Sequence, residues 1–256
     1  MPELVERCIA SWKKQMPDWK YRLWNEESLA QVLQKPTSNP SLKGREQNTQ
    51  QLPFVTKENE WLDYMPRYVQ EAYAAKKYAF VSDYVRLWAL KQYGGLYMDV
   101  DFEVYRSFDD LMEQYDAFAG YEGSKRNPVM MGVIAAKAHH PWIQGMMKTY
   151  ENRVFLKEDG SLDMTPNTGY FLGWMQAHGF VADGTEKDFM DVHILPVEFF
   201  CPGLTTGENL RCERTYCEHK GLHSWSGNGG WKTKLLNLVG NKWKIRLIKL
   251  KRRILG

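Results

Sequence analysis

One segment of the chain changes clearly from a helical to an extended pattern of apolar and polar residues. Residues 83–93 are good or neutral helix formers and include neither Gly nor Pro. Ser82 stands where a helix N-cap is expected, and Gly94 stands where a helix commonly ends in a left-handed conformation. The apolar residues 96–98 follow at once. The pattern predicts a helix over 83–93 and then a short strand.

Two aspartates stand at the carboxyl end of the predicted strand. Asp99 and Asp101 are separated by one residue, and side chains on a strand alternate between its faces. We therefore expect both carboxylates on one side, where they can share a divalent cation. Hard cations such as Mg²⁺ are commonly held by one or two protein carboxylates together with the phosphates of a substrate. The pair predicts a site for a phosphate-bearing ligand.

Asp83 and Arg86 belong to the first turn of the predicted helix. Their spacing of three places them side by side on one helix face, so both can reach one ligand. Such a pair is, by itself, more commonly an exposed ion pair. The aspartates that follow the strand favour a ligand site, because ligands of open α/β sheets lie at the carboxyl ends of strands.

The run over 79–86, followed by that over 93–101, resembles the sugar-binding, DXD-containing glycosyltransferases. This group, similar to glycosyltransferase family 32, includes initiating mannosyltransferases, capsular polysaccharide transferases and, more distantly, the large clostridial glucosylating toxins. Asp-x-Asp alone is a weak signal. The whole constellation is much more specific.

Other parts of the chain are similar to the same family. Residues 8–13 and 17–25 resemble its early helix and the strand that follows, and residues 215–225 resemble its closing motif. The resemblance extends roughly from residue 3 to residue 226. It implies an α/β, GT-A-type Rossmann-like fold for nucleotide sugars, with a mixed, mainly parallel sheet flanked by helices.

The resemblance also implies an activity. We expect a metal-dependent, retaining glycosyltransferase that uses Mn²⁺ or Mg²⁺. It would move a sugar from a nucleotide sugar, with UDP favoured over GDP, to a glycan or lipid-linked glycan acceptor in cell-surface polysaccharide synthesis. No residue is identified as a covalent nucleophile, so we favour a same-face substitution in which the leaving phosphate accepts the proton of the incoming hydroxyl.

Roles for individual residues follow from the same resemblance. Asp101 would bind the metal directly, and Asp99 would contact the ribose or the waters of the metal. Asp83 and Arg86 would hold the hydroxyls of the donor sugar, and Tyr97 would lie beside the nucleotide.

The closing motif is expected to form a mobile lid over the diphosphate and the metal. His219, Ser224 and Trp225 would be its donor-binding residues, and His219 would be a further metal ligand. The family usually has two adjacent histidines here. This chain has Lys220 after His219 and a second histidine only at His223, so which imidazole faces the ligand stays open.

Two departures from the family stand out. Members normally begin with a strand carrying a Lys-Ile-Ile-His-x-x-Trp-like run that helps to hold the base, and this sequence begins just past it. A late start, a truncation, or real loss of the strand with weak or no activity would each explain this. In addition, the polar residues 34–59 read as a flexible insertion that could serve as an acceptor-side loop.

Composition adds few constraints. With 256 residues and 43% hydrophobic content, the chain is expected to form one domain over 1–231. No apolar run approaches the roughly 20 residues that span a bilayer, and no signal-peptide profile is present, which predicts a cytoplasmic protein. The four cysteines lack metal-finger spacing, so buried free thiols are expected.

The C-terminal residues 232–256 form a basic tail. Nine Lys or Arg and no acid occur from Lys232 onward, so the first 231 residues carry a net charge of −6. Apolar residues recur at helical spacing between 242 and 254, which predicts a basic amphipathic helix. Such a helix either lies on the anionic inner face of a membrane or packs on the domain. Nucleic-acid binding is not expected, because the rest of the chain is acidic.

Two other functions compete with glycosyl transfer. The Asp99 and Asp101 pair could belong to a haloacid-dehalogenase-type phosphatase, with the first aspartate as nucleophile. The chain could also be a non-catalytic descendant that binds a nucleotide sugar. Asn127 and Asn167 lie in segments that resemble donor- or acceptor-facing loops, and Trp225 and Trp231 are candidate ligand contacts near the lid. His139, His140, His178 and His193 support no functional role.

Overall fold

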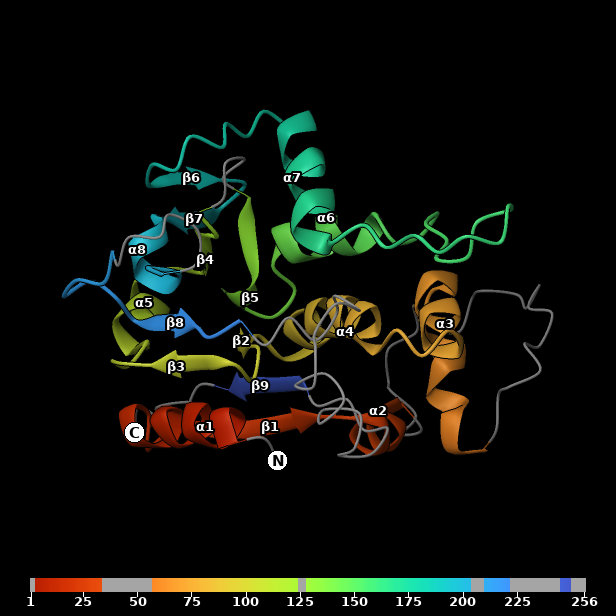
Figure 1. Cartoon of the computed structure of the whole chain (residues 1–256), viewed down its shortest axis with the longest axis horizontal. Coiled ribbons are helices and arrows are strands. Elements are labelled where there is room, and N and C mark those ends of the chain that lie inside the picture. The colour runs from red at the N-terminus through yellow and green to blue at the C-terminus, as the bar shows by residue number, and fades with distance from the viewer. Residues whose placement is uncertain (1–2, 34–56, 124–127, 204–209, 222–244, 250–256) are drawn as a thin grey trace.

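A computed structural model describes residues 3–33, 57–123, 128–203, 210–221 and 245–249 (Figure 1). Its helices are α1 (Glu3–Gln15), α2 (Glu26–Leu33), the 3₁₀ helix η2 (Lys57–Tyr64), α3 (Arg67–Ala74), α4 (Tyr78–Tyr93), α5 (Asp109–Gln114), α6 (Pro141–Lys148), α7 (Asn167–Ala177) and α8 (Val197–Phe200). Its strands are β1 (Lys20–Trp24), β2 (Gly95–Met98), β3 (Phe102–Val104), β4 (Ala117–Tyr121), β5 (Val129–Ala136), β6 (Lys187–Phe189), β7 (Val192–Leu195), β8 (Cys217–His219) and β9 (Ile245–Lys249).

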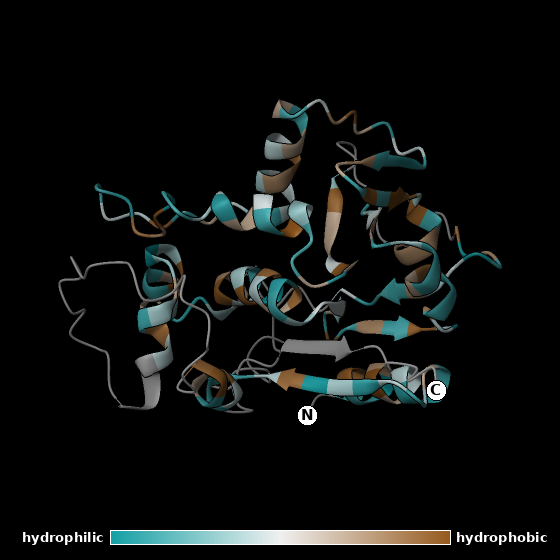
Figure 2. Ribbon diagram, turned by 180° about the vertical axis from the view of Figure 1, so that it is seen from behind, coloured by the Kyte–Doolittle hydropathy of each residue, from teal (hydrophilic) through white to brown (hydrophobic). Residues whose placement is uncertain are grey.

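Seven strands form one sheet in the order β1-β9-β2-β5-β4-β7-β6, and β3 pairs with β8 in a separate two-stranded sheet. Apolar side chains cover both faces of the large sheet. On β2, Tyr97 belongs to the core cluster that includes residues of α3, α4, α6 and α7, whereas Leu96 and Met98 belong to the cluster that includes residues of α1, α5 and α8. Figure 2 shows the matching distribution of hydropathy: the fully buried strand β5 is mostly brown (hydrophobic), and the edge strand β6 is teal (hydrophilic). This layered arrangement confirms the expected α/β class, with a mixed sheet flanked by helices.

The expectation of a mainly parallel sheet is wrong. Among the described strands of the large sheet, β4 and β7 form a parallel pair, and every other neighbouring pair is antiparallel. Connection lengths explain part of this. The links from β4 to β5 and from β6 to β7 are too short for the crossover that a parallel pair requires, whereas β4 and β7 are joined through α6 and α7.

The predicted tail helix is also wrong for the part of the tail that the structure describes. Residues 245–249 are strand β9, which lies between β1 and β2 and is antiparallel to both. Figure 1 shows this strand beside the N-terminal elements. The tail contributes backbone hydrogen bonds to the central sheet here, so the amphipathic-helix argument for membrane contact fails over these residues. Residues 242–244 and 250–254 lie outside the described part.

Helix α4 starts earlier than predicted. It begins at Tyr78, with Lys77 at the N-cap position, and Ser82 lies inside the helix and donates its hydroxyl to the Ala79 carbonyl at 2.6 Å. The cause is the tight turn after α3, where Lys76 adopts a positive φ of 56°. No Gly or Asn marks this turn in the sequence. The predicted end is confirmed, because Gly94 follows the helix with φ 63°.

Two further expectations concern segments around the sheet. Of the predicted insertion at 34–59, residues 57–59 belong to η2 and the others lie outside the described residues. None of the helices in the described ranges combines the length and apolar character that a membrane span requires.

Gly94 is expected to be costly to replace. A Cβ at this position would lie 2.6 Å from the Ala138 amide nitrogen, in a backbone conformation that L-residues avoid. Gly94→Ala should lower the free energy of unfolding by at least about 2 kcal/mol in urea titrations. Gly173→Ala in α7 is the matched control, since a Cβ there meets nothing within 4 Å. It should be neutral or stabilise the helix by up to about 1 kcal/mol. Equal losses for both variants would contradict the steric argument.

The cysteines should differ in reactivity. Cys8, Cys201 and Cys217 are buried free thiols, as predicted, but Cys212 is exposed. Burial raises the pKa of Cys8 to about 11, which suppresses its reactive thiolate. A chromogenic disulfide reagent should modify one thiol quickly in the folded protein and the other three only after unfolding. The fast phase should disappear in Cys212→Ser; its persistence would show that a buried thiol is reached.

Candidate functional site

The centre of the candidate site is the guanidinium of Arg86, which is buried in the middle of α4. Its Nη2 donates to Asp83 Oδ1 at 2.9 Å, so the predicted pair on one helix face is confirmed. Because α4 begins at Tyr78, the two residues lie in its second and third turns and not at its N-terminus. The helix start therefore contributes nothing to this site.

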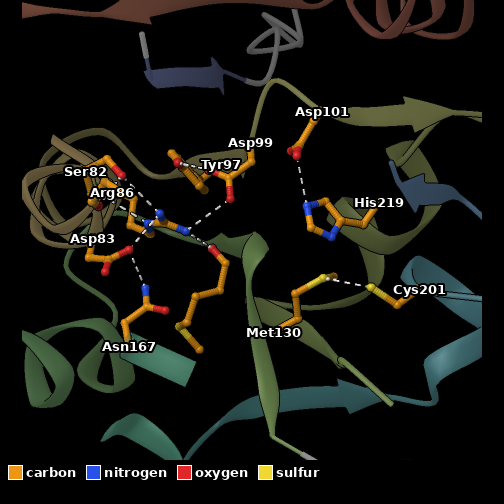
Figure 3. Close-up of polar contacts among 12 residues, drawn as sticks. Ser82, Asp83, Arg86, Tyr97, Asp99, Asp101, Met130, Asn167, Cys201 and His219 are labelled. Carbon is orange, nitrogen blue, oxygen red and sulfur yellow. Dashed lines mark hydrogen bonds and ion pairs between the residues drawn. The ribbon is translucent and has the colours of Figure 1, made fainter. Parts of the chain in front are cut away.

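Arg86 also contacts β2 and β5. Its Nη1 donates to the Met131 carbonyl at 2.5 Å and lies 3.6 Å from Asp99 Oδ2. The guanidinium carbon lies 4.6 Å from the centre of the Tyr97 ring. Figure 3 shows Arg86 between the carboxylates of Asp83 and Asp99. One buried cation therefore holds two anions that come from different elements.

Asp99 is the most open of these groups. Its side chain is 34% exposed, against 13% for Asp83 and 6% for Arg86. The hydroxyl of the buried Tyr97 donates to Asp99 Oδ1. The Tyr97 hydroxyl is thus engaged by Asp99, and the predicted position of Tyr97 beside the nucleotide stays a prediction.

The two aspartates do not lie on a strand, contrary to the argument from strand alternation. Strand β2 ends at Met98, and residues 99–101 form a turn in which the Phe102 amide donates to the Asp99 carbonyl at 3.3 Å. The chain must turn here because β3 belongs to a different sheet from β2. Space for the turn depends on Gly132, where a Cβ would lie 3.0 Å from Asp99 Oδ2 and 2.8 Å from the Phe102 ring.

Asp101 is paired with His219. The imidazole Nε2 lies 3.0 Å from Asp101 Oδ2, and the ring stacks on Phe102 with centroids 4.7 Å apart. The pairing of β3 with β8 brings these residues together, because Phe102 lies opposite His219 in the register. The Lys220 amide also donates to the Asp101 carbonyl at 2.9 Å. His219 of the closing motif thus contacts Asp101, and its predicted role as a metal ligand stays a prediction.

The ammonium of Lys220 belongs to a different cluster. Its Nζ donates to Glu218 at 2.6 Å and to the Tyr105 hydroxyl at 3.0 Å, and lies 3.1 Å from Glu103. Glu103 and Glu218 lie opposite each other, one position along from the Phe102 and His219 pair, so they project from the other face of the ribbon. Of these two neighbouring residues, His219 contacts Asp101, whereas Lys220 extends its ammonium to Glu103 and Glu218.

Burial and charge shift the pKa values of the site in opposite directions. Burial raises the pKa of Asp83 to about 7 in spite of the neighbouring Arg86. Burial also raises the pKa of Asp99, and the charge of Asp101 adds to this rise while Arg86 opposes it. For His219 burial acts to lower the pKa, but the hydrogen bond and charge of Asp101 outweigh it and the pKa is raised.

Asn167 is a site residue that the sequence indicated only loosely. It is the first residue of α7, it is 8% exposed, and its Nδ2 donates to Asp83 Oδ1 at 2.7 Å. Within the described part of the chain, both contacts of Asp83 go to Oδ1, and Oδ2 has none. A side chain 84 positions away thus fixes how Asp83 is presented.

Several predicted residues stay untested. Ser224, Trp225, Trp231, His223 and Asn127 lie outside the described residues. Of the other histidines, His140 caps α6, where its Nδ1 accepts from the Trp142 amide at 3.3 Å, which fits a structural role. Among the described residues no group of three or more His, Cys, Asp or Glu side chains is arranged to hold a metal ion.

The N-terminal part of the chain, which includes the aspartate motif, matches a known protein family. Residues 2–118 match the family described as a glycosyltransferase sugar-binding region containing a DXD motif. The matched region covers just under half of the chain. It includes Asp83, Arg86, Tyr97, Asp99 and Asp101, but neither Asn167 nor His219.

The chain is also similar to an uncharacterized glycosyltransferase of Acanthamoeba polyphaga mimivirus. The two are 23% identical over 168 residues, which cover 64% of each chain. The chain thus spans slightly less than two thirds of this relative. No solved structure gives a significant match. The chain is similar to glycosyltransferases. Neither comparison points to a phosphatase.

The raised pKa of Asp83 predicts a specific dependence of stability on pH. The ordinary pKa is 3.8 and the folded value is about 7, so between these values the folded state holds a proton that the unfolded state has released. Stability therefore falls as the pH rises from about 4 to about 7, and this contribution disappears in Asp83→Asn. Urea unfolding of both proteins across this range measures it.

Asp116→Asn is the control for loss of a carboxylate, because the Asp116 side chain is 63% exposed. The difference in unfolding free energy between Asp116→Asn and the wild type should not show the pH dependence that is expected for Asp83→Asn. If Asp83→Asn and the wild type lost stability in parallel over this window, the buried carboxyl would not titrate there.

Proposed function

We propose that this chain transfers a sugar from a nucleotide sugar to a hydroxyl of a glycan or glycolipid acceptor, with a divalent cation as cofactor and within a GT-A-type fold. The observation that carries the proposal is the buried contact of Arg86 with both Asp83 and Asp99. Surface ion pairs contribute little and need no such burial. A guanidinium only 6% exposed between two carboxylates, beside the motif that matches a sugar-binding family, supports a preorganised binding site.

Asp83 would select the donor sugar. Asn167 and Arg86 both bind Oδ1, so Oδ2 can accept a hydrogen bond from a sugar hydroxyl. Where the pH is high enough to ionise Asp83, whose pKa is about 7, this hydrogen bond is stronger than one between neutral groups. A site built to bind a hydroxyl also discriminates strongly against sugars that lack it, because its buried polar groups would then be unpaired.

The residues present fit a divalent cation in chemical kind. Asp99 and Asp101 offer carboxylate oxygens. Burial raises the pKa of Asp99 and the charge of Asp101 adds to this rise, and a bound cation would relieve that repulsion. Asp99, Asp101 and His219 would hold Mn²⁺ or Mg²⁺. When bound, the cation would neutralise the charge that develops on the departing diphosphate.

The protein's own groups would prepare this step. Tyr97 and Arg86 hold the two oxygens of Asp99, and His219 holds Asp101, so both carboxylates keep fixed orientations before a ligand arrives. We infer retention of the anomeric configuration by same-face substitution, in which the leaving phosphate accepts the proton of the acceptor hydroxyl. Capture of a glycosyl adduct on a carboxylate would rule this out.

The donor partners proposed here are UDP-sugars in preference to GDP-sugars. Ser224 and Trp225 would complete the donor site as part of a lid, and the acceptor would be a polysaccharide or its lipid-linked precursor. The competing interpretation, a non-catalytic relative that binds the donor without turnover, predicts the same binding and no transfer.

Nucleotide binding should be metal-dependent. In thermal unfolding with UDP or GDP, each with and without Mn²⁺, a bound nucleotide at a hundredfold excess over its dissociation constant should stabilise the protein by about 2.7 kcal/mol. The increment should require Mn²⁺ and vanish when Asp99 and Asp101 are both replaced by Asn. Asp116→Asn should keep it. A shift that ignores the metal or survives the double replacement would refute the assignment of the cation site.

A further inference from the structure

A second buried guanidinium lies close to the sugar site. Arg153 follows α6, and its side chain is 6% exposed. Its Nε and Nη2 both donate to Asp163 Oδ2, at 2.9 and 2.8 Å. This pair lies outside the region that matches the sugar-binding family. No local pattern in the sequence marks Arg153 and Asp163 as a pair.

Aromatic rings from three parts of the chain surround this guanidinium. Its carbon lies 4.0 Å from the centroid of Tyr170 in α7, 4.4 Å from that of Tyr68 in α3 and 5.6 Å from that of Tyr150. Its Nη1 is buried and has no hydrogen-bond acceptor among the described residues. Cation–π interactions with these rings therefore stabilise the part of the guanidinium that includes Nη1.

The polar contacts of Arg153 lead to the start of α7. Nη2 reaches the Thr165 carbonyl at 3.4 Å, and Asp163 Oδ1 accepts from the Thr165 amide at 3.1 Å. Pro166 follows as the N-cap of α7, and Asn167 is the first helical residue. Both the backbone amide and the backbone carbonyl of Thr165, in the segment before α7, are thus hydrogen-bonded to this ion pair. Asn167, whose side-chain amide binds Asp83, lies two residues after Thr165.

Arg153 and Asp83 also interact through charge. The positive charge of Arg153 favours the ionised form of Asp83, against the effect of burial, which raises the pKa of that carboxyl. Burial raises the pKa of Tyr68 and of Tyr150, two of the tyrosines that surround Arg153, and the charge of Asp83 adds to this rise. The two buried ion pairs therefore belong to one polar region.

We propose that Arg153 is a positioning residue of the sugar site. Its planar fork fixes Asp163 and Thr165, and thereby the place from which Asn167 holds Asp83. Arg153 itself touches no substrate. The proposal deepens the proposed function and rests on it for its effect on sugar binding, but its structural part, from Arg153 to Asn167, can be tested without any ligand.

The first test observes the Asn167 side chain directly. In ¹⁵N-labelled protein, its amide resonances, assigned by their absence from Asn167→Ala, should be slow to exchange with solvent because the group is buried and bonded to Asp83. In Arg153→Met they should move and exchange faster. In Arg106→Met they should not change. Arg106 is a matched control, because it also pairs with a carboxylate, Asp110, and lies over a tyrosine ring. Unchanged Asn167 resonances in Arg153→Met would overturn the proposal.

The second test separates positioning from general stability. Arg153→Lys keeps the charge but loses the fork. With Mn²⁺ present, UDP should bind Arg153→Lys within about twofold of the wild type. UDP-glucose or another UDP-hexose that the wild type prefers over UDP should bind about tenfold more weakly or worse. Arg153→Lys combined with Asn167→Ala should bind that sugar nucleotide no more weakly than Asn167→Ala alone.

Full retention of sugar binding in Arg153→Lys, or additive losses in the combined variant, would overturn the role of the fork. Equal weakening of UDP and UDP-hexose would show a structural role alone. If the wild type binds UDP-hexoses no better than UDP and GDP-hexoses no better than GDP, the proposed function fails. The resonances of Asn167 would still decide whether Arg153 positions it.

Discussion

The burial of the Arg86 guanidinium is the constraint on which the site depends. A charged group removed from water is costly unless it is paired and hydrogen-bonded, and removing one partner leaves the other charge uncompensated. Arg86 meets this requirement with Asp83 and Ser82 from its own helix, the Met131 carbonyl of β5, and Asp99 beyond the end of β2. Helix α4 and the two strands are thereby fixed relative to one another, and the carboxyl groups of Asp83 and Asp99 cannot move far.

The turn at residues 99–101 is closely packed next to Arg86. The turn that carries Asp99 and Asp101 lies against β5, and a side chain at Gly132 would collide with both Asp99 and Phe102. Phe102 then forms the surface on which the His219 ring stacks. The small sheet of β3 and β8 thus has a structural role in the site. It sets the position of Asp101 and of the imidazole that binds it.

The sequence predicted local features well and long-range pairings poorly. The spacing of Asp83 and Arg86, the end of α4 at Gly94 and the strand before Asp99 all depend on a few neighbouring residues, and all three are found. The start of α4 was missed because Lys76 turns the chain without a glycine. The turn at residues 99–101 and strand β9 were missed because each depends on which strand pairs with which. Asn167 lay beyond prediction as a partner of Asp83, since nothing local to either residue marks the other.

Strand β9 has a consequence for how the protein folds during its synthesis. Lys249 pairs with Lys20, so the sheet joins residues at nearly opposite ends of the sequence. Until β9 has left the ribosome, β1 lacks its neighbour in the sheet and β2 has one open edge, and contacts of such long sequence separation form slowly. The nascent chain therefore keeps these edges unpaired while the residues between β2 and β9 are synthesised. A chaperone or another strand with a matching pattern would have that interval in which to bind beside the strand that carries the aspartate motif.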